Sequence, residues 1–162
     1  MPLRTARAIG MFCVALSIGA TQIAGAADFD KGLAALHSGD YATAFQEFRS
    51  LAEQGHTSAQ YNLGNRYANG QGVPQDYAEA VTWYRKAAEQ GDANAQLNLG
   101  YMYAKGQGVP QDYVQAHMWF NLSASQDGKD AAYNRDIAAE RMTNQQISES
   151  QALARKWVAK NR

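Results

Sequence analysis

Cysteine and proline are scarce in this chain, which has one cysteine and three prolines in 162 residues. The single cysteine, Cys13, lies in an apolar stretch near the N-terminus and has no partner for an intrachain disulfide. Neither a disulfide-stapled fold nor a cluster of thiolate metal ligands is therefore possible. Stability must come from side-chain packing.

The sequence also lacks an excess of charge of either sign and any long apolar run. Lys and Arg number 15, Asp and Glu number 15, and no block of like charge stands out. A nucleic-acid partner is not expected, because such proteins carry a basic stripe. The hydrophobic content of 46% is that of an ordinary globular protein. It excludes wholesale disorder and a polytopic membrane protein.

The N-terminal segment has the pattern of a signal peptide. Arg4 and Arg7 precede an apolar stretch at residues 8–20, which is too short to span a bilayer. The small residues Ala24-Gly25-Ala26 follow, and they predict cleavage before Ala27. The alternative is an uncleaved amphipathic anchor. Cleavage would leave a periplasmic or secreted protein with no membrane span.

Most of the remaining chain repeats with a period of 36 residues. Residues 59–94 and 95–130 align without a gap, and 19 of the 36 positions are identical. The loop at 70–77 recurs letter for letter at 106–113. A degenerate unit with a shorter loop precedes them. Self-similarity at such a period is typical of a repeat architecture.

Each unit has the pattern of two helices. In the first helix Ala59 and Leu63 follow the spacing of one buried stripe, and Gly70 can end it in the left-handed conformation. Asp76 and Glu79 have the spacing of a capping box at the start of the second helix. Asp112 and Gln115 repeat that spacing in the next unit, and so do Thr143 and Gln146 near the C-terminus.

Glycines in the middle of the first helices predict a close helix crossing. Gly64 and Gly100 occupy equivalent positions, where glycine costs about 1 kcal/mol relative to alanine. Because both units accept this cost, we expect the glycines to face a neighbouring helix, with Ala80 and Ala116 as the opposing surfaces. A last segment departs from the repeat and is expected to cap the stack.

These patterns together predict the domain organisation. The expected boundaries are 1–26 for the signal peptide and 27–162 for a single repeat domain, with units at about 29–58, 59–94 and 95–130 and a C-terminal cap at 131–162.

The motifs resemble those of a known family. Ala-x-x-x-Leu-Gly-x-x-Tyr, Gly-x-Gly-Val-x-x-Asp and Ala-x-x-Trp-Tyr/Phe-x-x-Ala/Ser-Ala are similar to the Sel1-like repeat, a relative of the tetratricopeptide repeat. The resemblance implies an all-α, right-handed α-solenoid that acts as an adaptor and has no shared active site. One exported, cysteine-rich branch is associated with β-lactam binding, and the lack of cysteines after Cys13 argues against that branch here.

No catalytic, metal or cofactor motif stands out beside the repeats. The histidines have no ligand-like spacing; they are His37, His56 and His117. The Gly70-Gln71-Gly72 loop lacks the lysine of a phosphate cradle. Trp83 and Trp119 fall at frame positions, so we expect them in the core and not in a ligand-stacking box. We therefore predict a protein that is not an enzyme and holds neither metal nor cofactor.

A periodic set of polar residues on the first helices suggests the binding face. Asn62, Asn98 and Asn134 recur one repeat apart, and Asn65 and Tyr101 lie about one helical turn further on. In such superhelices the first helices line the concave face, where partners bind most often. An amide offers a donor and an acceptor to an extended peptide. The alternative is that these amides tie neighbouring helices together.

The leading functional hypothesis is an exported scaffold that grips a segment of a partner protein. The alternative from another class is a cell-envelope enzyme or sensor that acts on β-lactams or cell-wall precursors. A third possibility is a capped repeat that works as one piece of a larger assembly.

Overall fold

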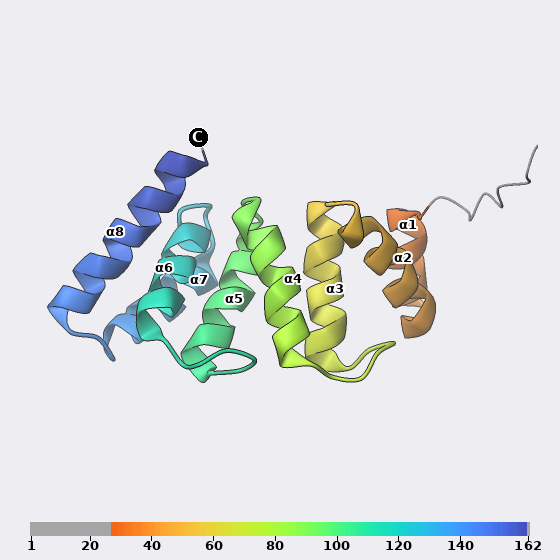
Figure 1. The fold of residues 1–162 in the computed structure, drawn as a ribbon, viewed down its shortest axis with the longest axis horizontal. Coiled ribbons are helices and arrows are strands. Elements are labelled where there is room, and N and C mark those ends of the chain that lie inside the picture. The colour runs from red at the N-terminus through yellow and green to blue at the C-terminus, as the bar shows by residue number, and fades with distance from the viewer. Residues whose placement is uncertain (1–26, 162) are drawn as a thin grey trace, which may run out of the picture.

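The structure is a computed structural model that describes residues 27–161 of the chain. The predicted signal peptide at 1–26 lies outside the described residues. Within them the regular elements are eight α-helices, with no strand, which confirms the predicted all-α class (Figure 1). The helices are α1 (Phe29–His37), α2 (Tyr41–Glu53), α3 (Thr57–Asn69), α4 (Tyr77–Glu89), α5 (Ala93–Lys105), α6 (Tyr113–Ala124), α7 (Lys129–Ala139) and α8 (Asn144–Lys160).

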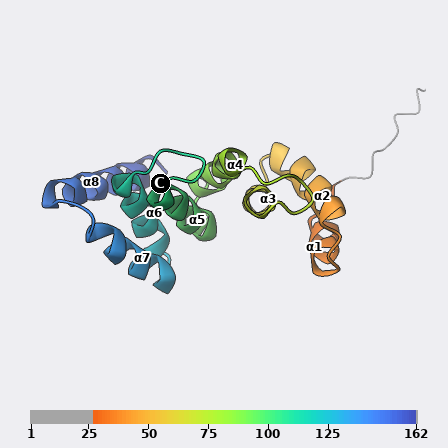
Figure 2. The same ribbon diagram turned by 90° about the horizontal axis from the view of Figure 1, so that it is seen from below.

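The helices form a solenoid of antiparallel pairs. From α1 to α7 each helix packs against the next one in the chain. Seen along the helices, the stack is an arch with two rows, of which α1, α3, α5 and α7 form the concave side (Figure 2). We call these four the inner helices and their exposed surface the inner face. The helices α2, α4 and α6 lie on the convex side.

Side-chain caps begin most of these helices. The Asp76 carboxylate accepts hydrogen bonds from the backbone N–H groups of Ala78 and Glu79. The predicted reciprocal half of this capping box is absent, because the Asp76 N–H already donates to the Tyr67 carbonyl at 3.0 Å. Asp112 repeats this arrangement, so its carboxylate caps α6 as predicted while the predicted reciprocal bond from Gln115 is absent. The box of Thr143 and Gln146 is complete and confirms the prediction for α8.

The long loops lock each unit onto the preceding one. Gly72 and Gly108 have φ angles of 78° and 71°, which side-chain-bearing residues rarely adopt. A Cβ atom on Gly72 would also overlap the carbonyl of Tyr41, and one on Gly108 would overlap that of Tyr77. The loop of one unit therefore lies directly on the first turn of the previous convex helix.

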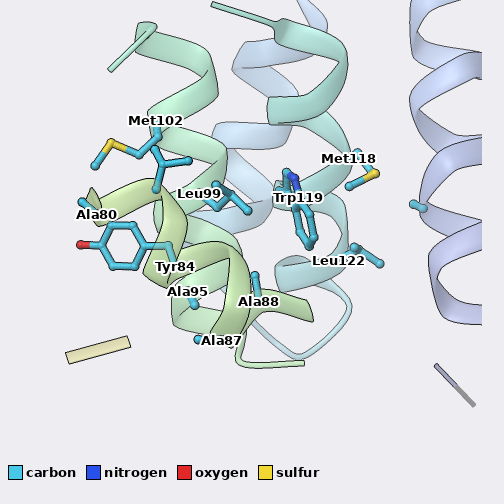
Figure 3. Packing of buried hydrophobic residues seen from close by; sticks show 12 residues of the cluster. Ala80, Tyr84, Ala87, Ala88, Ala95, Leu99, Met102, Met118, Trp119 and Leu122 are labelled. Carbon is cyan, nitrogen blue, oxygen red and sulfur yellow. The ribbon is translucent and has the colours of Figure 1, made fainter. Parts of the chain in front are cut away.

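The core runs along the length of the solenoid between the two rows. Leu63 and Leu99 are fully buried at equivalent positions. Trp83 and Trp119 are 9% and 5% exposed, which confirms their expected place in the core. Figure 3 shows Leu99 between Met102 on one side and Trp119 on the other.

The mid-helix glycines do face a neighbouring helix, but not the predicted alanines. A Cβ atom on Gly64 would lie 2.6 Å from the Tyr84 ring, and one on Gly100 would lie 2.5 Å from the Phe120 ring. Ala80 and Ala116 are buried elsewhere in the same helices, so their assignment as the opposing surfaces was wrong. An aromatic ring lies against the bare glycine backbone and occupies the space that a methyl group would take.

The C-terminal segment closes the stack in an unexpected way. The inner row continues through α7, whereas α8 packs on α6 and not on α7 as a helix pair would. Ser150 and Ala154 of α8 are buried in this contact, and Trp157 meets Trp119 edge to face at 6.4 Å. The last helix therefore covers the exposed end of the core.

We predict that Gly100→Ala destabilises the protein by about 1–3 kcal/mol, because the new methyl group would displace the Phe120 ring. On an unobstructed helix the same change would stabilise by about 1 kcal/mol. Urea unfolding of Gly100→Ala with and without Phe120→Leu measures the coupling. The penalty should shrink in the leucine background. A stabilising Gly100→Ala would contradict the proposed contact.

Candidate partner-binding face

Hydrogen bonds join polar residues of successive inner helices. The Asn65 side-chain oxygen accepts from the Tyr84 hydroxyl at 2.7 Å and from the Asn98 amide at 3.3 Å. One unit further along, the Asn134 amide donates to the Tyr101 hydroxyl at 2.7 Å. The same sequence separation of 33 residues links both inter-unit pairs. The predicted residues thus pair with one another across the unit boundaries.

A hollow of about 420 Å³ lies between α3 and α5, beside the first of these pairs. Asn65, Asn98 and Tyr101 line it together with Lys105 of α5. Tyr84 of α4 also lines it and is almost fully buried, so the ring contributes little surface to the hollow beyond its hydroxyl end. The surface is mainly one of amides and phenol groups with a single cation.

A second, smaller hollow of about 200 Å³ adjoins α7. Tyr101 and Lys105 line both hollows, and Asn134, Ile137 and Arg141 are among the other residues that line the second. Ile137 is 40% exposed, which is unusual for a large apolar side chain in this protein. The two hollows therefore follow each other along the inner face, and the second one is more apolar.

Asn62 differs from the other predicted residues. Its amide donates to the Ser58 carbonyl in its own helix at 2.8 Å, and it lines neither hollow. The residue 33 positions before it is Phe29, which has no polar side-chain atom to accept a bond. Asn62 is half-buried on the inner face without the inter-unit bond that Asn98 makes.

Four of the five predicted residues, all but Asn62, line the two hollows. Sequence reasoning missed Tyr77, Tyr84, Lys105, Ile137 and Arg141 as lining residues. The signal for Lys105 was present, because it is the last residue of a predicted inner helix. Ile137 and Arg141 lie beyond the last clear repeat, where no period identified their face.

The burial of Tyr84 keeps its hydroxyl group uncharged at the edge of the first hollow. Burial raises the pKa of Tyr84 well above its ordinary value, so its hydroxyl stays a neutral hydrogen-bond donor. With the Asn65 oxygen accepting two bonds, its amide nitrogen is the group left to donate toward a bound molecule. This arrangement can hold a peptide backbone by hydrogen bonds without any charged pair.

Comparison with known proteins agrees with this architecture. The family pattern described as Sel1 repeat matches residues 57–92 and 93–128. The chain contains two Sel1 repeats. These matched segments hold the pairs α3–α4 and α5–α6, which carry the first hollow. No curated protein matches the chain significantly.

Solved structures of Sel1-type proteins superpose on the chain. A protective antigen of uropathogenic Escherichia coli, c5321, which displays an SLR fold, is 36% identical with a TM-score of 0.76, over 80% of this chain and 29% of that one. A Sel1 repeat protein from Oxalobacter formigenes is 33% identical with a TM-score of 0.64, over 67% and 44%. The Helicobacter pylori cysteine rich protein B is 31% identical with a TM-score of 0.52, over 54% and 66%.

No group of three or more His, Cys, Asp or Glu side chains in residues 27–161 is placed to hold a metal ion. His56 caps α3 by accepting from the Ala59 N–H, in the capping role expected for a turn histidine. In the same residues no helix is both long and apolar enough to cross a membrane.

His117 lies on a packed face of α6. It is 4% exposed and shares a 2.7 Å hydrogen bond with Ser150 of α8, which is itself fully buried. Burial lowers the pKa of His117; Arg135 lowers it further, and Asp136 opposes the shift. The neutral imidazole therefore fastens the last helix to the solenoid.

This contact predicts a loss of stability in mild acid. The folded protein holds His117 neutral, whereas the unfolded chain takes up a proton as the pH falls below about 6.5. Proton uptake then favours unfolding, and above this pH the ionisation of His117 no longer changes the free energy of unfolding. Thermal melting between pH 5 and 8, at about 1-unit steps, should show the loss.

The preceding repeat supplies the matched control for this prediction. His117→Val restores the residue found there, Val81, and Ser150→Ala removes the hydroxyl that would be left without a partner. The double variant should lose less stability than the parent protein between neutral and acid pH. Identical pH dependence in the two proteins would contradict the assignment.

Proposed function

We propose that this Sel1 repeat protein is an exported scaffold that binds an extended segment of a partner protein along its inner face, without catalysing a reaction. Sel1 repeat proteins generally mediate protein–protein interaction. The observation that carries the proposal is the row of half-buried amides and tyrosines beside two adjoining hollows. The partner-binding residues are Asn62, Asn65, Asn98, Tyr101 and Asn134.

The chemistry of the face favours a peptide segment over a small ligand. An extended backbone presents N–H and C=O groups in alternation. The side-chain amides of Asn65 and Asn98 together offer donors and acceptors for both kinds of group. The hollows between units have room for side chains, while Ile137 and the exposed Tyr133 ring offer apolar contact on α7. The chain covers 29% and 44% of two of its structural relatives, so their whole activities do not transfer to it.

The enzyme alternative gains no specific support. The hollows on the inner face are lined by amides, phenol groups, apolar side chains and isolated cations, with no acid–base pair. The relative named for its cysteines is similar in fold, but residues 27–161 of this chain contain none. Sel1 repeats are a scaffold type of repeat.

Export is proposed from the sequence of the first 26 residues alone. Arg4, the apolar stretch and Ala24-Gly25-Ala26 support cleavage before Ala27. N-terminal sequencing of the protein from a bacterial envelope fraction should begin at Ala27. A chain that still contains Cys13 would contradict the proposal.

The inner face can be tested by comparing two asparagines. Asn62→Ala removes an amide that makes no inter-unit bond, so the melting temperature should stay the same while partner binding weakens. Asn98→Ala also removes the bond to Asn65 and should cost about 0.5–1.5 kcal/mol of stability. Binding is measured by pull-down from the envelope fraction and then by titration with the captured partner.

The double variant Asn62→Ala/Asn98→Ala gives the decisive result. We expect partner binding to fall by about 1–3 kcal/mol if the amides make buried hydrogen bonds to the partner. Thr82, on the convex helix α4, supplies the control, and Thr82→Ala should leave binding unchanged. Normal binding by a folded double variant would show that the asparagines serve only the structure.

A further inference from the structure

Arg66 of α3 is a buried cation with unused hydrogen-bond donors. The residue is only 5% exposed, and among the described residues it is the buried one with a permanent charge. Its Nε and Nη1 atoms have no hydrogen-bond partner. A buried charge is ordinarily paired, because desolvation without compensation is costly. The folded protein alone therefore leaves two of the three guanidinium nitrogens without a hydrogen-bond acceptor.

The surroundings of Arg66 contain no compensating anion. The ionisable groups that act on it are the phenols of Tyr41, Tyr61 and Tyr84, and none is a carboxylate. Burial lowers the pKa of Arg66, yet a guanidinium stays protonated in proteins. The charge lies 5.8 Å from the centre of the Tyr41 ring, which is 38% exposed.

The internal repeat shows that the fold does not need this charge. The residue one repeat later is Met102, which is also 5% exposed and belongs to the core. Met102 lines the hollow between α3 and α5. An apolar side chain of similar length therefore fills this position of the repeat equally well. The packing of the repeat does not require the charge of Arg66.

The charge of the neighbouring inner face has the same sign. Neither α3 nor α5 contains an aspartate or glutamate, and the last turns of these helices carry Arg66 and Lys105. The Lys105 Nζ lies 5.8 Å from the centre of the Tyr101 ring, at the border of the two hollows. The convex helices α2 and α4 each carry two glutamates beside basic residues, with one arginine on α2 and an arginine and a lysine on α4.

No carboxylate of residues 27–161 pairs with Arg66, and neither end of this sequence brings one close. Residues 1–26 contain no aspartate or glutamate, so the N-terminal segment cannot supply one. The C-terminal end of α8 lies at the opposite end of the solenoid from α1 and α2 (Figure 1). An anion on another molecule would satisfy the donors that Arg66 leaves unpaired.

We propose that Arg66 recognises a carboxylate of an acidic partner segment, and that Lys105 engages a second carboxylate one repeat further along the inner face. A guanidinium can bind a carboxylate through two parallel hydrogen bonds, whereas the lysine acts as a single charge. The proposal rests on the proposed function, since it specifies the chemistry of the segment that the inner face binds.

Three fluorescent octapeptides test this proposal on the purified protein. The first alternates alanine and aspartate with an amidated C-terminus, the second replaces aspartate by asparagine, and the third is the asparagine peptide with a free C-terminal carboxylate. Fluorescence polarisation should show the aspartate peptide binding at least about tenfold more tightly than its amidated asparagine counterpart. Tighter binding of the third peptide instead would identify a terminal carboxylate as the source.

Variants assign the preference to the two cations. Arg66→Met, which copies the next repeat, should abolish most of the preference for carboxylate, and Lys105→Gln should reduce it. Arg49→Met removes a positive charge from the exposed surface of α2 and should leave the preference unchanged. The melting temperature of Arg66→Met should equal or exceed that of the parent, because an unpaired buried charge is removed.

Several results would overturn the proposal. These are equal binding of all three peptides, no binding of any of them, and a preference that survives both Arg66→Met and Lys105→Gln. A melting temperature lowered by Arg66→Met by about 5 °C or more would also do so, since it would give the arginine a structural role. None of these results decides the proposed function, which the asparagine variants test with the captured partner.

Discussion

The contact between a bare helix backbone and an aromatic ring sets the geometry of every unit. Gly32 faces the Phe48 ring, Gly64 faces Tyr84 and Gly100 faces Phe120. Because the ring lies where a Cβ atom would be, the two helices of a pair come close enough to bury a small core. The loop glycines then fix each pair on the one before it, and the inner helices come into line. A binding face exists only because this spacing repeats.

The face itself is made by residues that differ between repeats. At the ring position only the middle unit has a hydroxyl, on Tyr84, and it orients Asn65 beside the first hollow. Arg66 and Met102 occupy equivalent buried positions in successive repeats, so a charged side chain in one repeat corresponds to an apolar one in the next. Where Val81 lies in one repeat, His117 fastens the last helix in the next. Shared positions thus build the solenoid, and exceptions to the repeat give it specific chemistry.

The sequence predicts the frame well because the frame is local and repeated. Helix order, the buried tryptophans and the cap at Thr143 follow from periodicity and short-range spacing. The bonds from Asn98 to Asn65 and from Asn134 to Tyr101 join units, and no spacing rule distinguishes them from solvent-facing amides. The capping boxes failed at Asp76 and Asp112 since a distant carbonyl had already taken the N–H. The docking of α8 on α6 depends on tertiary contacts that no local pattern encodes.

The central claim is that the inner face, and not the convex one, receives the partner. Amide chemical-shift mapping of the isotope-labelled protein with the captured partner segment tests this claim most directly. The account predicts that the largest shifts fall on α3, α5 and α7, including the side-chain amides of Asn65 and Asn98. Shifts concentrated on α2, α4 and the outer surface of α8, with those amides unmoved, would contradict it.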